Sequence, residues 1–365
     1  MAGIAIVGGG VVGCATAYYL SKEGANVTLL ERGELAGEAT GAAAGILTPA
    51  ETMPGGVFRD LCAAGAALYP SLVEALRDEI GIDVQHTRSG VLLPAENEGR
   101  AHALRSIATG ASSPTGLEWV EGETLHRLEP ALTRDVLGAA YSSDVCHVNP
   151  GLVAQGLAQA AASRGAAIRP ATAVSRFETR GDRVTGVRTS GGNTIAADVV
   201  VLAAGPWTGR LAARLGASVP TRPMRGQMLA YRSGAVRHVI WGESGYLVVK
   251  AGGFVFAGAT VEDVGFRPRT TARGLAGLRR MASALAPALR HAEVASAWAG
   301  LRPGSPDGRP IMGPLPGWRN VYVATGHFRN GILLGPITGK LIAQLITTGE
   351  TEPSLSPFSA GRFGS

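Results

Sequence analysis

Three glycines near the start of the chain have the spacing of a phosphate-binding turn. Gly8, Gly10 and Gly13 form the pattern G-x-G-x-x-G between a short apolar run and a helical pattern. The first glycine of such a turn allows a sharp bend, the second lets a diphosphate approach the backbone, and the third lets the helix pack on the strand. Glu31 ends the next apolar run, where its carboxylate can accept hydrogen bonds from ribose hydroxyls. The pattern predicts a dinucleotide-binding βαβ unit between Met1 and Arg32.

Two further runs of small residues favour a flavin over a nicotinamide dinucleotide. One is Thr40-Gly41-Ala42-Ala43-Ala44-Gly45, and the other is Ala203-Ala204-Gly205-Pro206-Trp207 at the end of the apolar run 198–203. Small side chains let a flat ring and a diphosphate lie against the backbone. A flexible linker is the alternative explanation for the first run. Three such points along the chain suit an extended ligand, and they predict FAD.

A single arginine near the C-terminal third could bind a carboxylate. Arg302 follows Trp298-Ala-Gly300-Leu and precedes Pro303-Gly304, which predicts an arginine directly after a strand and held by Pro and Gly. A guanidinium in a cleft binds a carboxylate through two parallel hydrogen bonds. Taken alone, this segment is better explained by an arginine on the surface.

Other chemistries lack their motifs. The run from Gly335 to Lys340 has one residue too few for a P-loop, and Gly242-Glu-Ser244-Gly245 is not the G-x-S-x-G of a hydrolase. The seven histidines form no metal-binding spacing, so we expect no metal. Cys14, Cys62 and Cys146 are odd in number and widely spaced, which indicates buried, reduced thiols of a cytoplasmic protein.

The composition is that of an ordinary globular protein. The chain has 365 residues, of which 45% are hydrophobic and 17% charged, with a formal net charge of +6. The densest basic stretch, from Arg267 to Arg280, has no interleaved aromatic residues beyond Phe266, so we interpret it as a solvated helix face and not a nucleic-acid site. The apolar stretch 4–20 lacks a basic start and is broken by glycines, which argues against a signal peptide or a membrane span.

The order of the elements predicts an α/β fold with a second, α+β domain. Apolar strand and helix patterns of the doubly wound kind occur at the start, in the middle and at the end, with antiparallel patterns between them. We therefore expect a Rossmann-type FAD-binding domain made of residues 1–82, 142–210 and 297–350. An antiparallel-sheet substrate domain, 83–141 and 211–296, is inserted into it. Residues 351–365 read as a loose tail.

Individual elements follow from local signals. Asn149-Pro150 has the residues preferred at a helix start, and the pattern predicts a helix to about Ser163. A strand is expected from Ile168 to Glu178. Mostly helical structure is expected from Glu51 to Ile80.

The chain resembles the FAD-dependent D-amino-acid oxidase superfamily, and within it the glycine oxidases of thiamine biosynthesis. The resemblance covers nearly the whole sequence. Its most specific segments are IAIVGGGVVG (4–13), TGAAAGIL (40–47), GATVEDVGF (258–266), WAGLRPGSPDGRPIMGP (298–314) and ATGHFRNGILLGP (324–336).

The resemblance implies roles for particular residues. Arg302 would bind the substrate carboxylate, and Tyr246 would donate a hydrogen bond to the same group. Arg329 would lie near the mouth of the site, with a structural ion pair as the alternative, and these three form the expected catalytic group. Ser244 and Val261 occupy substrate-pocket positions that vary in the family. The residues expected to contact FAD are Gly8, Gly10, Val11, Val12, Gly13, Glu31, Arg32, Thr40, Ala43, Ala44, Gly45, Val174, Ala204, Gly205, Trp207, Arg302, His327, Arg329, Asn330, Gly331 and Ile332.

The resemblance also implies a reaction. A small amino acid such as glycine would lose hydride from its α-carbon to flavin N5, and oxygen would take up the electrons as hydrogen peroxide. The imine would give glyoxylate and ammonia, or supply the thiazole branch of thiamine biosynthesis. FAD would be non-covalent, because the cysteine that tethers flavin in related sarcosine oxidases has no counterpart in the C-terminal half. We expect a homotetramer without a nucleic-acid or membrane partner.

Other functions remain compatible with the sequence. They are sarcosine or broad D-amino-acid oxidation, a dehydrogenase with another acceptor, a flavin-dependent tRNA-modifying module, and a non-catalytic FAD-binding protein.

Overall fold

The computed structural model describes residues 3–47, 55–109 and 116–364. One half of the molecule is built on a six-stranded sheet with the order β20-β21-β13-β1-β2-β9. These strands are Ile311–Pro314, Val321–Thr325, Val199–Leu202, Gly3–Val7, Asn26–Leu30 and Ala167–Arg169, respectively. All neighbours pair in parallel except β20 and β21. The predicted βαβ unit thus lies at the centre of the sheet.

Alternating residues of β1 enter two different cores. Ile4 and Ile6 face a core shared with α1 (Val11–Lys22), α2 (Val57–Ile80), α5 (Pro150–Ser163) and α8 (Gly331–Thr348). Ala5 and Val7 face the other side, toward β10 (Val174–Arg180), β11 (Arg183–Thr189) and α6 (Thr208–Ala213). Because strand side chains alternate between faces, this sheet is buried on both sides, as expected for a parallel sheet.

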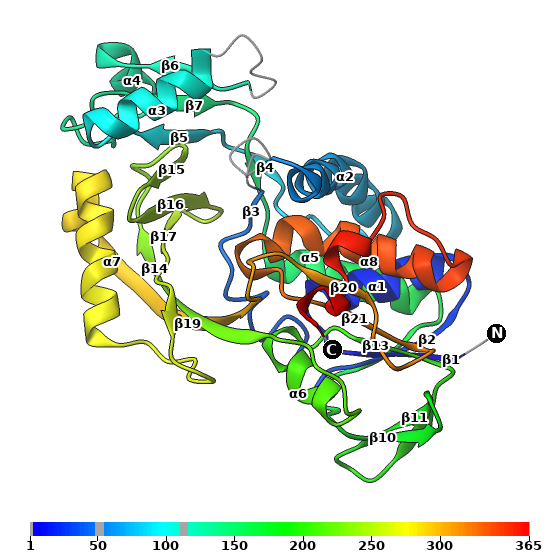
Figure 1. Ribbon diagram of the computed structural model, residues 1–365. Coiled ribbons are helices and arrows are strands. Elements are labelled where there is room, and N and C mark those ends of the chain that lie inside the picture. The colour runs from blue at the N-terminus through cyan, green and yellow to red at the C-terminus, as the bar shows by residue number, and fades with distance from the viewer. Residues whose placement is uncertain (1–2, 48–54, 110–115, 365) are drawn as a thin grey trace.

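The other half contains a nine-stranded sheet whose main path is β18-β14-β17-β16-β15-β5-β7-β6, with β19 paired to β14 (Figure 1). In this order the strands are Glu262–Asp263, Arg222–Arg232, Phe254–Gly258, Gly245–Lys250, Val239–Gly242, Val91–Pro94, Ala139–Ser142 and Glu118–Val120, and β19 is Glu293–Gly304. Helix α7 (Ala272–Leu285) packs on it through Leu278 and Met281. The remaining helices and strands are α3 Glu98–Thr109, α4 Gly122–Leu128, β3 Ile46–Leu47, β4 Thr87–Arg88, β8 Cys146–His147 and β12 Thr194–Ala196, with the 3₁₀ turns Gly205–Trp207, Pro287–Arg290, Phe328–Asn330, Ser356–Phe358 and Ala360–Phe363.

Several local predictions are confirmed and others are wrong. The Asn149 side chain accepts a hydrogen bond from the Leu152 amide and caps α5, which ends at Ser163. The expected strand from Ile168 to Glu178 is two strands, because Pro170 and the positive φ of Ala171 (51°) turn the chain into a different sheet. In the helical region expected from Glu51, α2 begins at Val57, and residues 51–54 lie outside the described part.

We retain the expected division of the chain into an FAD-binding and a substrate domain as a proposal, with one boundary changed. The first contains the six-stranded sheet and the second contains most of the nine-stranded sheet. The predicted boundary at residue 297 falls inside β19, which pairs with β14 from Glu293 to Gly304. The strand is continuous because its partner β14 is long enough to pair with all of it. Arg302 therefore lies within a strand and not after one.

The prediction of a loose tail at 351–365 is wrong. Leu355, Phe358 and Ala360 are buried in the two cores of the six-stranded sheet. Arg362 makes two hydrogen bonds to the carboxylate of Asp307, at 2.9 and 3.1 Å. Apolar residues spaced too irregularly for a helix or strand pattern pack here as two short 3₁₀ turns.

Helix α8 is a core helix. The stretch Phe328–Thr348 is long and apolar enough to cross a membrane, but most of it is buried inside the protein. It packs closely against α1, where a Cβ on Gly339 would lie 2.5 Å from the Cβ of Ala15. The basic stretch is only partly helical, since Arg273, Arg279 and Arg280 are exposed on α7 whereas Arg267 and Arg269 precede it.

Candidate functional site

The glycine turn brings the start of α1 close to the ends of β1 and β13. Gly8 has φ of 118°, and a Cβ there would lie 2.4 Å from the carbonyl oxygen of Ala203. A Cβ on Gly13 would lie 1.9 Å from the carbonyl oxygen of Gly8. Both positions therefore require glycine. Gly13 acts through this packing and does not line a cavity.

The Glu31 carboxylate is held at the end of β2 by backbone amides. Its Oε2 accepts from the Gly9 amide at 2.7 Å, and its Oε1 accepts from the Gly33 amide at 2.8 Å. Next to it, the Arg32 guanidinium lies 3.7 Å from the centroid of the Trp207 ring and pairs with Glu38. The expected ribose-binding carboxylate is thus fixed by the protein's own backbone.

Two cavities meet along the glycine turn. One, of about 330 Å³, is bounded by Glu31, Arg32, Val174 and Trp207. The other, of about 230 Å³, is bounded by Tyr246 and Arg302. Both cavities are lined by Gly10, Ala39, Thr40, Ala203 and Gly205, so they form one elongated cleft.

The residues of this cleft fit an extended dinucleotide such as FAD. No heavy atom outside its chain neighbours lies within 4 Å of a Cβ built on Gly205, so any side chain there would project into the cleft. The N-cap residues Gly10 of α1 and Asn330 of α8 make no side-chain cap, although the Val11 amide donates to the Thr40 hydroxyl at 3.1 Å. Helix N-termini with free amides favour anionic and electron-rich groups.

Most of the predicted cofactor residues line this cleft. The larger cavity is also lined by Gly8, Thr40, Ala204 and Gly205. The smaller cavity is also lined by Gly10, Val11, Val12, Ala43, Ala44, Gly45, His327, Arg329, Gly331 and Ile332. Asn330 lines neither, because it ends the 3₁₀ turn that precedes α8.

The substrate end is formed by β16 and β19. Arg302 pairs with Met224 across the sheet, and its Nη1 donates to the carbonyl oxygen of Thr260 at 3.0 Å. Its guanidinium is paired with no carboxylate in the described part of the chain. Burial lowers the pKa of Arg302, and the nearby Tyr246 hydroxyl partly opposes this effect. A buried cation without an anionic partner is well suited to bind a carboxylate.

Tyr246 lies beside this guanidinium. Its hydroxyl is 3.5 Å from the sulfur of Met228, and burial raises the pKa of the phenol while Arg302 acts to lower it. The hydroxyl therefore stays protonated at neutral pH and can donate a hydrogen bond. The two predicted carboxylate-binding residues are brought together from strands far apart in sequence.

The mouth of the cavity carries the remaining predicted residues. Arg329 is exposed on the 3₁₀ turn Phe328–Asn330, and it has no ion pair within the ranges described above. Ser244 and Val261 also line this cavity, and Val261 is 42% exposed. The alternative role of Arg329 in a structural ion pair finds no support in these contacts.

Several lining residues were missed by sequence reasoning. Trp241, Met228, Gly226 and Glu243 line the smaller cavity, and Arg210 and Arg214 line the larger one. None of them belongs to a motif of the sequence. Glu243 is a carboxylate at a site where none was expected, but it is 3.9 Å from Arg100 and bonded to Asn97.

Histidine and cysteine contribute no evident acid–base or metal site. His327 is buried with its Nε2 2.9 Å from the Thr338 hydroxyl, and burial lowers its pKa to about 4. No cluster of three metal-binding side chains occurs among the described residues. Cys14 and Cys62 are buried as expected, whereas Cys146 is half-buried, and none of the three lines the cleft.

Comparisons with known proteins agree with this geometry. The chain matches the family described as FAD dependent oxidoreductase over residues 3–345. It is 37% identical over 368 residues to a glycine oxidase of Geobacillus kaustophilus, which covers 98% of this chain and 96% of that protein. It is 35% identical to the bifunctional protein ThiO/ThiG of Trichormus variabilis, which covers 99% of this chain and 55% of that protein.

Solved structures give the same result. The crystal structure of glycine oxidase from Geobacillus kaustophilus has a TM-score of 0.93 at 34% identity, with 99% of both chains covered. Iminodiacetate oxidase from Chelativorans sp. BNC1 has a TM-score of 0.89 at 29% identity, with 98% of both chains covered.

Proposed function

This chain belongs to the FAD dependent oxidoreductase family, and from this premise we propose that it oxidises glycine and similar small amino acids with oxygen as the acceptor. It is an FAD-dependent amino-acid oxidase. The observation that carries the proposal is Arg302, a buried guanidinium without an anionic partner among the described residues, which lies beside Tyr246 at the inner end of the cleft. Glycine oxidases are the relatives that match over nearly the full length.

In this proposal the protein contributes chiefly by orienting the substrate. Arg302 and the Tyr246 hydroxyl bind the carboxylate together, in the smaller cavity that both residues line. When bound in the cleft, FAD would supply an acceptor for the hydride and a route for two electrons to oxygen. Correct placement of a reacting bond accounts for much of the rate enhancement in such reactions.

A general base is not required. If the amine binds as its neutral form, its lone pair assists the departure of hydride. This agrees with the residues present: His327 is bonded to Thr338, and Glu243 is half-exposed and engaged by Asn97 and Arg100. Arg329 at the mouth would attract the carboxylate before it reaches Arg302.

FAD would be held without a covalent bond. None of the cysteines lines the cleft, and the amides of the glycine turn with Glu31 supply contacts for a diphosphate and a ribose. Val174 would meet the adenine through its backbone, since it lines the larger cavity. Denaturation with acid should release the flavin into the supernatant, whereas flavin that stays with the precipitated protein would contradict this proposal.

The test of function is peroxide formation by the purified yellow protein. We expect hydrogen peroxide with glycine and sarcosine, and weaker activity with D-alanine and D-proline. Flavin that these amines reduce without peroxide would point to a dehydrogenase. No reduction by any of them would refute the assignment to small amino acids.

We also propose a biological setting for this activity. A role in thiamine biosynthesis is favoured by the similarity to ThiO/ThiG, and a cytoplasmic homotetramer is our proposal for its state in solution. Light scattering that gives about the chain mass of 37.4 kDa would refute self-association.

A further inference from the structure

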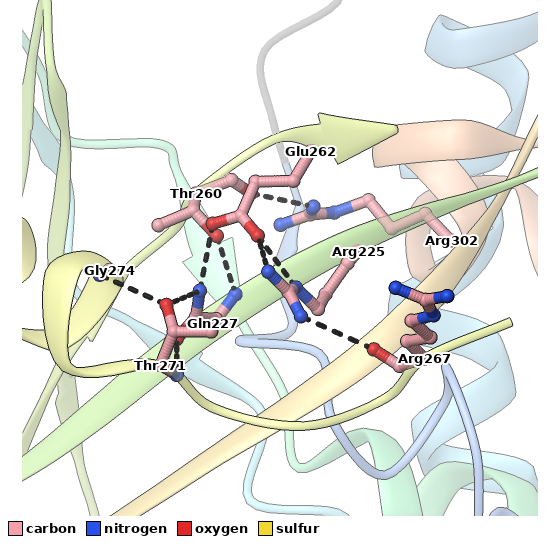
Figure 2. A network of polar contacts seen from close by, with 8 residues as sticks. All are labelled: Arg225, Gln227, Thr260, Glu262, Arg267, Thr271, Gly274 and Arg302. Carbon is pink, nitrogen blue, oxygen red and sulfur yellow. Dashed lines mark hydrogen bonds and ion pairs between the residues drawn. The ribbon is translucent and has the colours of Figure 1, made fainter. Parts of the chain in front are cut away.

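A buried polar network lies behind the strand that faces the substrate. Met224 of β14 pairs with Arg302, and Gly226 pairs with Gly300. Because strand residues alternate, Arg225 and Gln227 point to the opposite face of the sheet from Arg302. Figure 2 shows these side chains meeting Glu262 and Thr271 on that face. Gln227 has no exposed surface, and Arg225 is 6% exposed.

Every polar group at the centre of this network has a partner. The Glu262 Oε2 accepts from Arg225 Nε at 2.6 Å and from its Nη2, and the Glu262 Oε1 accepts from Gln227 Nε2 at 2.7 Å. The Gln227 Oε1 accepts from the Thr271 amide at 2.7 Å. Burial acts to raise the pKa of Glu262, but the hydrogen bonds from Arg225, Gln227 and Thr260 outweigh it and keep the pKa low. The carboxylate thus stays ionised.

Thr260 connects this network to the substrate site. The backbone amide of Gln227 donates to the Thr260 hydroxyl at 2.9 Å. The backbone amide of Thr260 donates to the backbone carbonyl oxygen of Gln227 at 3.4 Å. The carbonyl oxygen of Thr260 then accepts from Arg302 Nη1 at 3.0 Å (Figure 2). Two residues further on, Glu262 is anchored by Arg225 and Gln227.

The acceptor on Arg302 needs such support. A guanidinium that binds a carboxylate through two parallel bonds must hold its plane fixed, and an arginine side chain loses much rotamer freedom when it is held. Here one face of the guanidinium is against Gly226, where a Cβ would lie 2.3 Å from Nη1. The acceptor itself lies between β17 and the short strand β18 (Glu262–Asp263), in a segment that Gln227 and Arg225 of β14 hold to the sheet.

We propose that Arg225, Gln227 and Glu262 are positioning residues for carboxylate recognition. They hold the segment 260–262 so that the Thr260 carbonyl keeps the Arg302 guanidinium in the orientation that binds substrate. The inference rests on the proposed function, since it presumes that Arg302 binds a carboxylate.

The pairing of donors and acceptors provides a sharp test. In Gln227→Glu alone, the carboxylates of residues 227 and 262 face each other and repel. In Glu262→Gln alone, the new side-chain N–H group faces a donor of Arg225 or of Gln227. The double variant Q227E/E262Q exchanges the two groups, so that an amide N–H again faces a carboxylate oxygen between residues 227 and 262, while oxygen acceptors remain for Arg225 and the Thr271 amide. We expect each single variant to raise the KM for glycine about tenfold with a smaller change in kcat. The double variant should return to within about threefold of the wild type.

Binding of acetate to the oxidised enzyme gives a second reading that does not depend on turnover. Acetate carries a carboxylate without an amine, and its Kd can be followed through the flavin absorbance. We expect the single variants to weaken acetate binding by the same factor as KM, and the double variant to restore it. Thr260→Val is a milder variant, because it removes only the hydroxyl that Gln227 holds; it should raise both constants while the Tm falls little.

Glu79→Gln is the matched control. Glu79 pairs with Arg164 at 2.8 Å and is 23% exposed, close to the 24% of Glu262, but α2 contributes no residue to the cleft. It should lower the Tm without changing the KM or the acetate Kd. Single variants with a lower Tm but wild-type constants for glycine and acetate would overturn the proposal. So would a double variant that regains Tm but not KM.

The two proposals fail differently. A wild-type protein that binds acetate but oxidises no amino acid would refute the proposed function, while the acetate constants still test the network. A wild-type protein that does not bind acetate at all would refute the role of Arg302 and, with it, the positioning role.

Discussion

At the scale of single residues, the partner of each arginine determines what that arginine can do. Arg225 and Arg302 lie on adjacent strands of one sheet, and both are largely buried. Arg225 is neutralised by Glu262, so its charge is used inside the protein. Within the described part of the chain, Arg302 donates to the Thr260 carbonyl and pairs with no carboxylate, so its charge is available to a ligand. The same type of side chain is structural in one place, and in the other we propose that it binds the substrate.

Replacement of Arg302 tests this difference directly. Arg302→Ala should lower kcat/KM by a factor that corresponds to roughly 3–5 kcal/mol, the range for breaking a buried charge pair. Steady-state kinetics with glycine checks the prediction. Arg269→Ala is the control, since Arg269 is exposed on the loop before α7 and should change kcat/KM little. A loss of less than tenfold for Arg302→Ala would remove this residue from its proposed role.

Buried histidines predict how stability depends on pH. Burial lowers the pKa of His327 from 6.5 to about 4, and burial together with the nearby Lys250 lowers the pKa of His147 to about 3. The unfolded chain therefore binds these protons near pH 6.5, whereas the folded protein does not. The contribution of these two histidines to the free energy of unfolding should stay constant above this pH and fall as the pH is lowered toward 4.

Urea denaturation at a series of pH values measures this slope. Each histidine contributes up to about 1.4 kcal/mol per pH unit within its window. His327→Gln keeps a hydrogen-bonding group for Thr338 and should reduce the slope by the contribution of one proton. Equal slopes in the variant and the wild type would show that His327 titrates normally in the folded state.

At the scale of elements, the close approach of two helices supports the glycine turn. Gly335 and Gly339 of α8 face Val11 and Ala15 of α1, and a Cβ on Gly339 would lie 2.5 to 2.6 Å from the backbone of Ala15 and Thr16. Small residues four apart on a helix let a neighbouring backbone approach. Since α1 begins at the glycine turn and α8 begins directly after the 3₁₀ turn Phe328–Asn330, this contact sets both helix starts relative to each other.

A pair of glycine-to-alanine variants tests this contact. Gly339→Ala should destabilise the protein by about 1–3 kcal/mol, the usual cost of overpacking a core. Gly277→Ala on α7 is the control: its nearest neighbour is Arg280 Nη2 at 4.0 Å, so it should be neutral or stabilise by up to about 1 kcal/mol. Chemical denaturation measures both. Similar effects of the two variants would mean that α1 and α8 can move apart without cost.

At the scale of the whole molecule, β19 leads the chain from the nine-stranded sheet to the six-stranded sheet. This strand pairs with β14 in the nine-stranded sheet, and the chain then leads into β20 of the six-stranded sheet. Gly300 in its middle lies against Ala42, where an added Cβ would come within 2.5 Å of the Ala42 Cβ. The Trp298 indole also donates to the Ala42 carbonyl oxygen at 3.1 Å. The strand that contains Arg302 and the small-residue run after the βαβ unit are therefore in direct contact.

The C-terminal segment packs into the two cores of the six-stranded sheet. Phe358 is 2% exposed, and Arg362 bonds to Asp307 in the connection between β19 and β20. Phe358→Ala should cost about 3–5 kcal/mol, as for other buried aromatic residues. Glu350→Ala at an exposed position should change stability by less than about 0.5 kcal/mol. A Phe358→Ala variant as stable as the wild type would mean that the segment is loosely attached, as its sequence alone suggests.

Local sequence patterns by themselves determine much of this protein. The βαβ unit, its three glycines and Glu31 are encoded within a stretch of about thirty residues, and buried parallel strands are recognisable from their apolar runs. The family follows from motifs such as WAGLRPGSPDGRPIMGP, which contains Arg302. These features were predictable because each depends on neighbours in the chain.

Contacts between distant segments were not predictable in the same way. Gln227 and Arg225 belong to no motif and Thr260 lies in the segment GATVEDVGF, but their relation to Arg302 arises because β14 pairs with both β18 and β19. The burial of Leu355 and Phe358 likewise depends on a surface formed by other parts of the chain. Pairing and burial of this kind require the complete fold, since a residue's partner across a sheet is set by the register of whole strands and not by its own neighbours.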